Sequence, residues 1–98
     1  MHSAAKNALL TAALLSGGLG SGITADKTIL LIAGRPSHGP GDHEFRAGSL
    51  LLQKCLNKVK GIKAEVHDFG WPKDDSAFEG IDALLIYADG GGGHPAIQ

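Results

Sequence analysis

The chain has 98 residues, with 9 Lys and Arg against 10 Asp and Glu, so its formal net charge of −1 offers no basic surface to nucleic acid or anionic lipid. Its 43% hydrophobic and 19% charged residues are typical of a globular domain and argue against wholesale disorder. A single cysteine excludes both an intrachain disulfide and a zinc site built from several thiolates. The length allows at most one small domain.

The first 25 residues have the order of a secretory signal peptide. Lys6 supplies the positive start, residues 8–15 form an apolar run, and a small, Gly-rich stretch leads to a cleavage point after Ala25. The apolar run is far shorter than the roughly 20 residues that a membrane-spanning helix needs. The sequence therefore predicts a secreted or periplasmic protein, with residues 1–25 removed and no membrane anchor afterwards. A plain N-terminal tail is the alternative interpretation.

Three segments of the mature part, residues 26–98, have strand patterns. Thr28–Ala33 and Ala83–Tyr87 are short, continuous apolar runs, which are typical of strands covered on both faces in a parallel sheet. Ile62–Asp68 alternates apolar and polar side chains, which predicts a half-exposed strand at a sheet edge. The first and third strands are therefore expected to be central and buried.

Between the first two strands, the residues from His43 to Lys60 have helical spacing. The stripe expected to pack on the sheet consists of Gly48, Leu51, Leu52, Cys55, Leu56 and Val59. Gly61 is expected to end the helix in the left-handed conformation. With right-handed crossovers, this order predicts an α/β fold: a flavodoxin-like parallel sheet with strand order 2-1-3, forming part of a domain.

In such sheets, ligands bind beyond the carboxyl ends of the strands, where the first and third strands adjoin. Two loops are expected to meet there, residues 35–43 and residues 89–94, and together they concentrate imidazoles, carboxylates and glycines. The substrate-binding candidates are His38, His43, Asp89, Gly91, Gly92 and His94, and the catalytic candidates are His43, Glu44 and His94.

The three loop histidines, His38, His43 and His94, can be interpreted in more than one way. They are candidate ligands for a divalent metal, since imidazole is the commonest nitrogen ligand, or they supply acid–base groups. Alternatively, each histidine only caps a helix or faces solvent. The tetraglycine before His94 lacks the Lys-Ser/Thr ending of a phosphate-binding loop, so we expect it to bring backbone amides close to a ligand. No cofactor is assigned from these patterns.

Several segments together resemble one known family. They are residues 29–34 (Ile-Leu-Leu-Ile-Ala-Gly), Ser37-His38-Gly39 with His43-Glu44, Gly70-Trp71-Pro72, and Asp89-Gly90-Gly91-Gly92-Gly93-His94-Pro95. The chain is similar to the opening of the ThuA-like (trehalose-utilisation) family, within the class I glutamine amidotransferase-like superfamily. The resemblance implies a flavodoxin-like fold, carbohydrate metabolism with a small sugar as ligand, and residues 26–98 as the N-terminal part of a longer domain. The superfamily's nucleophilic cysteine belongs to a later region.

The resulting hypothesis is an exported protein of trehalose-type sugar utilisation whose reaction is undefined. Two alternatives remain beside it. One is a non-catalytic module that binds a carbohydrate or a partner, and the other is a truncated fragment without independent activity.

Overall fold

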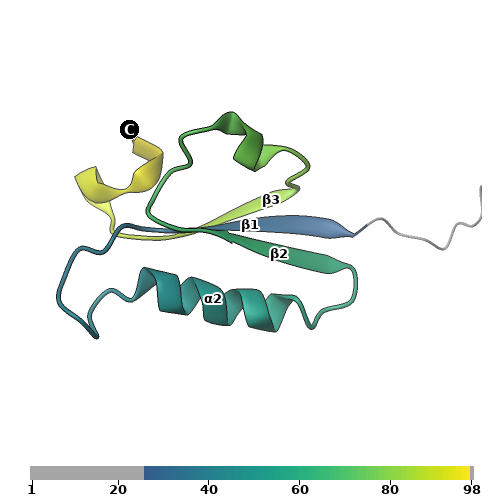
Figure 1. Cartoon of the computed structure of the whole chain (residues 1–98), viewed down its shortest axis with the longest axis horizontal. Coiled ribbons are helices and arrows are strands. Elements are labelled where there is room, and N and C mark those ends of the chain that lie inside the picture. Colours follow the sequence, from purple (N-terminus) through teal and green to yellow (C-terminus); the bar gives the residue numbers. More distant parts are fainter. Residues whose placement is uncertain (1–25, 98) are drawn as a thin grey trace, which may run out of the picture.

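The computed structural model describes residues 26–97, so the predicted signal peptide lies outside the described residues. Three parallel strands, β1 (Lys27–Ala33), β2 (Ile62–His67) and β3 (Ala83–Tyr87), form a sheet in the order β2-β1-β3 (Figure 1). Helix α2 (Phe45–Leu56) joins β1 to β2. The predicted α/β fold class and strand order are therefore confirmed.

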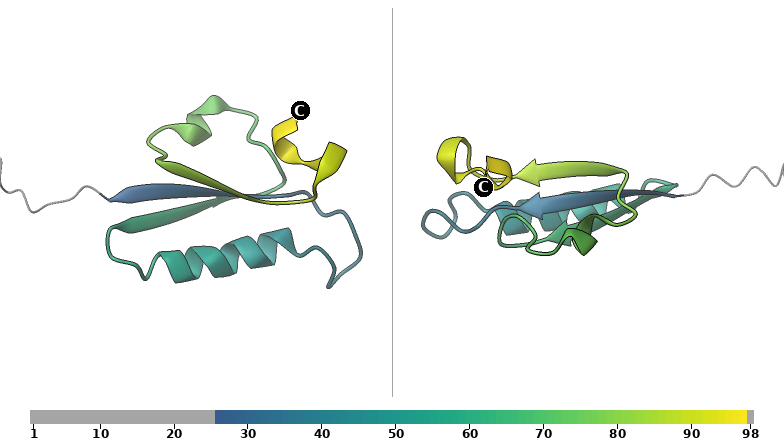
Figure 2. Two further views of the ribbon diagram at one scale, coloured as in Figure 1. Left: turned by 180° about the vertical axis from the view of Figure 1, so that it is seen from behind. Right: turned by 90° about the horizontal axis from the view of Figure 1, so that it is seen from above.

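The link from β2 to β3 contains the short 3-10 turn η1 (Asp75–Phe78), and two more such turns, η2 (Gly91–Gly93) and η3 (Pro95–Ile97), follow β3. The views from two sides place α2 and the η1 link on opposite sides of the sheet (Figures 1 and 2). None of the helices within residues 26–97 has the length and hydrophobicity of a membrane-spanning segment.

The core is built around β1, the middle strand. Its residues 30–33 are all buried, and Leu31 and Ile32 have no exposed surface at all. Leu31 lies opposite Val66 of β2 and Leu85 of β3, so it is covered from both neighbouring strands. A continuous apolar run suits this position because both faces of the strand are covered.

Helix α2 is shorter than predicted, and the face that it presents to the sheet includes only part of the predicted stripe, with Gly48 and Leu56 half-buried. It begins at Phe45 and ends at Leu56, and its buried residues are Phe45 and Ser49. Much of the predicted stripe is exposed instead: Leu51, Leu52, Cys55 and Val59. The prediction was therefore wrong for Cys55, Leu51 and Leu52, which do not line the interface with the sheet.

Close packing explains the rotation of the helix. A Cβ added to Gly48 would lie 2.5 Å from Cε1 of Tyr87, so the helix backbone approaches β3 where its side chains are smallest. Phe45 packs edge-on against the Tyr87 ring, with ring centroids 5.1 Å apart. Bulky leucines cannot enter so narrow a gap, and they face outward because of it.

The two outer strands differ in how their edges are protected. At β2, the outward-facing N–H of Ala64 donates to Asn57 Oδ1 at 2.7 Å, and its carbonyl accepts from Gln53 Nε2 at 3.1 Å. Asn57, the first residue after α2, therefore uses its side chain to cover the edge of β2. The chain then turns at Gly61, whose φ of +82° is the left-handed conformation expected there. The half-exposed edge strand predicted here is confirmed.

Strand β3 differs from its prediction as a buried central strand. It lies at an edge of the described sheet, with Leu84 42% and Tyr87 41% exposed. Its apolar run matches that of β1, but within residues 26–97 only β1 has a strand on each side. Within the described residues, β3 therefore combines the apolar run expected of a central strand with a neighbour on one side only.

Candidate functional site

The carboxyl ends of β1 and β3 hold the two predicted loops next to each other. The strands pair in parallel up to Ala33 opposite Tyr87, and the Gly34 N–H extends the pairing by donating to the Tyr87 carbonyl at 2.9 Å. A Cβ added to Gly34 would lie 2.7 Å from the Cβ of Ala88, so a glycine is needed for this approach. Both loops therefore leave the sheet in contact with each other.

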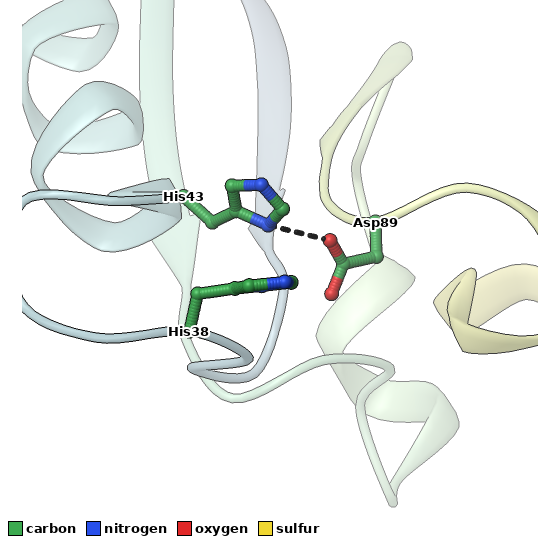
Figure 3. A group of neighbouring side chains, drawn as sticks. All are labelled: His38, His43 and Asp89. Carbon is green, nitrogen blue, oxygen red and sulfur yellow. Dashed lines mark hydrogen bonds and ion pairs between the residues drawn. The ribbon is translucent and has the colours of Figure 1, made fainter.

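Three polar side chains from these loops converge (Figure 3). His43 Nδ1 and Asp89 Oδ1 are 2.9 Å apart, although the two residues are 46 positions apart in sequence. The His38 ring lies against the His43 ring, with centroids 3.9 Å apart. One ligand atom from each of His38, His43 and Asp89 lies within 4.8 Å of the other two. We call this set the His-His-Asp group.

Ser37 connects the two imidazoles. Its hydroxyl lies 3.0 Å from His38 Nδ1 and 3.1 Å from His43 Nδ1. Because Ser37 and Asp89 both contact the same nitrogen of His43, this is not a Ser-His-Asp triad, in which serine and aspartate bind opposite ring nitrogens. Sequence reasoning did not single out Ser37 as a site residue. Its place in the Ser-His-Gly stretch was the available signal.

The Asp89 carboxylate is stabilised in its charged form. Hydrogen bonding by the Ser37 hydroxyl is the main effect that holds the pKa of Asp89 below its ordinary value. Desolvation opposes it, and the hydrogen bond and charge of His43 add to the lowering of this pKa. Asp89 is therefore an acceptor at neutral pH. It can orient the imidazole by holding a proton on Nδ1, which leaves Nε2 of His43 to accept a proton or bind a ligand.

Two backbone positions beside the group are strained. Among the described residues, only His43 (φ +45°) and Phe69 (φ +63°) are non-glycine residues with a positive φ. Both line a surface cavity of about 270 Å³, together with His38 and Asp68. Phe69 is also 60% exposed, an unusual position for a large aromatic ring. Each strained residue of this kind costs about 1–3 kcal/mol and persists only where the surrounding structure holds it in place. Such residues cluster at ligand sites.

Replacing Phe69 with Gly should raise the free energy of unfolding by about 1 kcal/mol, because glycine adopts a positive φ without a steric cost. Urea denaturation followed by circular dichroism measures the change. Phe69→Ala is the matched control, since it removes the same exposed ring but keeps the unfavourable φ. An equal gain from both variants would show that the backbone at this position is not strained.

Other candidate residues lie outside the His-His-Asp group. Glu44 accepts the Gly41 N–H at 2.7 Å, so its carboxylate stabilises the first loop, and it lines the cavity of about 270 Å³ beside His38 and His43 without joining the group. His94 Nδ1 accepts the N–H of Ala96 at 3.2 Å within the last turns. Gly91 and Gly92 are exposed in η2, with open space where a Cβ would stand. Of the three proposed metal-ligating histidines, two join the group, and its third member is Asp89.

Two further cavities adjoin the site. One of about 260 Å³ lies between the loops, lined in part by Arg35, Ser37 and Asp89. The other, about 490 Å³, is lined by Arg35, Phe69 and Trp71 among others. Trp71 itself packs against Phe78 with ring centroids 5.1 Å apart, so one role of this ring is to support the link. The rim therefore offers hydrogen-bonding groups beside apolar ring surface.

The fold places this chain in the broad class of α/β proteins with a parallel sheet, and the His-His-Asp group lies at the carboxyl end of that sheet. Comparison with protein-family models, with curated proteins and with solved structures gives no match. The ThuA-like resemblance therefore remains an expectation drawn from the motifs.

Proposed function

We propose that the protein serves in carbohydrate utilisation and binds a small sugar of the trehalose type at the rim formed by the two loops. The observation that supports this proposal is the His-His-Asp group, which presents closely spaced donors and acceptors next to cavities. Sugars require such sites because neighbouring hydroxyls both donate and accept hydrogen bonds. Exposed aromatic surface such as Phe69 can pack against the apolar face of a sugar ring.

The pairing of His43 with Asp89 gives this rim a chemical capability. With Nδ1 protonated and bound to Asp89, Nε2 of His43 can accept a proton from a sugar hydroxyl or from water, and Asp89 stabilises the resulting imidazolium. Export of the protein is part of the proposal. It depends on residues 1–25, which are outside the described part of the chain.

Calorimetric titration of the full chain with trehalose and with glucose tests the proposal. We expect His43→Ala and Asp89→Asn each to weaken sugar binding by about tenfold or more, because a charge-assisted hydrogen bond contributes about 1.5–3 kcal/mol. Asp75→Asn, a change of the same size at an exposed carboxylate of η1, is the matched control and should bind as the unmodified chain does. Unchanged affinity in both site variants would contradict the proposal.

One observation favours a second candidate, a binding module without catalysis. His38 and His43 are exposed and the Asp89 side chain is 30% exposed, so water is not excluded from the group. Enzymes that transfer protons usually shield the reacting groups from solvent. Incubating the protein with a bound sugar and analysing the sugar by NMR separates the candidates: an unchanged sugar indicates binding only, and a new product indicates an enzyme.

A further inference from the structure

Two imidazoles and one carboxylate meet at the rim, and all three come from loops that the sheet positions. We propose that His38, His43 and Asp89 bind a divalent first-row transition-metal ion such as zinc. Imidazole nitrogen and carboxylate oxygen are ligands that these ions share. The third ligand is therefore the Asp89 carboxylate and not the imidazole of His94, which the sequence analysis had considered.

The distances within the group suit such an ion. Zinc binds nitrogen and oxygen at about 2.0–2.2 Å, which sets neighbouring ligand atoms of a tetrahedral site about 3.3 Å apart. His43 Nδ1 and Asp89 Oδ1 are already 2.9 Å apart, and the three ligand atoms lie within 4.8 Å of one another. Closing the group therefore requires only a small movement of side chains on an exposed loop.

Charge also favours a cation at this position. Asp89 contributes a carboxylate, and an imidazole binds a metal in its neutral form. Nδ1 of His43 now shares a proton with Asp89, so a metal that binds this nitrogen replaces that proton. The strained backbone of His43, with φ +45°, then has an explanation, since it directs the ring toward Asp89.

Three protein ligands leave at least one coordination position open. The group borders cavities of about 270 and 260 Å³, so the open position faces space that a small molecule can enter. This is the arrangement of a catalytic or substrate-binding metal site, because structural zinc sites use four protein ligands. The inference rests on the proposed function in one respect: the group that completes the coordination is a hydroxyl of the sugar.

Metal binding can be measured without any sugar. The full chain, purified without a polyhistidine tag, is titrated with Zn²⁺ by calorimetry and with Co²⁺ by visible absorption, which reports the ligand geometry. Cys55 is an exposed thiol that can bind zinc itself, so Cys55→Ser serves as the background. We expect one equivalent to bind. In that background, His43→Ala and Asp89→Asn should each weaken binding by about 100-fold or more, since loss of even an outer partner of a ligand costs about 10–100-fold.

His94→Ala is the matched control, and its metal affinity should be unchanged because His94 lies outside the group. Absence of binding at millimolar metal, full affinity in His43→Ala, or an equal loss in His94→Ala would each overturn the inference. The two proposals fail separately. If sugar binds equally well in the presence of a chelator, the proposed function stands and the metal site is not needed for it. If metal binds but sugar does not, the metal site stands and the proposed function fails.

Discussion

Leu31→Ala should leave most of the isolated chain unfolded at 25 °C. Leu31 is fully buried at the centre of β1, between Val66 and Leu85 on the two flanking strands. Truncating a buried leucine costs about 2–5 kcal/mol, through lost burial and the cavity left behind. A single hydrophobic core of this size rarely supplies more than about 3–5 kcal/mol of stability, so the loss of one core leucine can remove most of it.

Circular dichroism and urea denaturation of the full chain measure this effect. Leu51→Ala is the matched control, because Leu51 is 64% exposed on α2 and its truncation should change stability by about 0.5 kcal/mol or less. Similar losses from the two variants would mean that the outward face of α2 is covered in solution and that the burial described for Leu31 does not dominate the core.

The contrast between these two leucines shows what the sequence can predict about this fold. A continuous apolar run gave the position of β1 and the parallel order of the sheet, because backbone pairing and right-handed crossovers leave few alternatives. The rotation of α2 about its axis was predicted incorrectly. It depends on Gly48, which allows the helix to approach Tyr87, and on the small buried Ser49 beside it, and hydrophobic periodicity gives no weight to small residues at a close contact.

The candidate site was predictable in location but not in membership. The predicted strand order brings both loops side by side, as the structure shows, and His38, His43 and Asp89 were all among the candidates. Sequence spacing could not decide whether Asp89 or His94 lies beside His38 and His43, because the answer depends on the conformation of the η2 turn. Asp89 lies two residues beyond β3, close to the point of pairing, whereas the η2 turn intervenes before His94.

The second large effect is expected at Gly34, where the pairing of β1 and β3 brings the loops together. A Cβ at this position would lie 2.7 Å from the Cβ and 2.9 Å from the Cα of Ala88, and 3.1 Å from a ring carbon of Phe45. The nearest obstacles include backbone, so the strands must separate where they now pair through the Gly34 N–H. We expect Gly34→Ala to destabilise the chain by about 1–3 kcal/mol, as overpacking in a core does.

The same substitution should also damage the site, because Ala88 immediately precedes Asp89. Moving Asp89 by about 1 Å from His43 breaks a contact that is now 2.9 Å, and misplacement of this size can cost about 100-fold in function. We therefore expect zinc and sugar affinity to fall by at least about tenfold in Gly34→Ala molecules that remain folded. Titration at a temperature well below the midpoint of unfolding separates this loss from loss of the fold.

Gly90→Ala is the matched control for Gly34→Ala. Gly90 follows Asp89 directly, its φ of −87° suits any residue, and nothing lies within 4 Å of an added Cβ. Its stability and ligand affinity should remain close to those of the unmodified chain. Adding Ala88→Gly to Gly34→Ala removes the closest clash and should restore part of both properties. If the double variant is no better than Gly34→Ala alone, the approach of the two strands is not what positions Asp89 against His43.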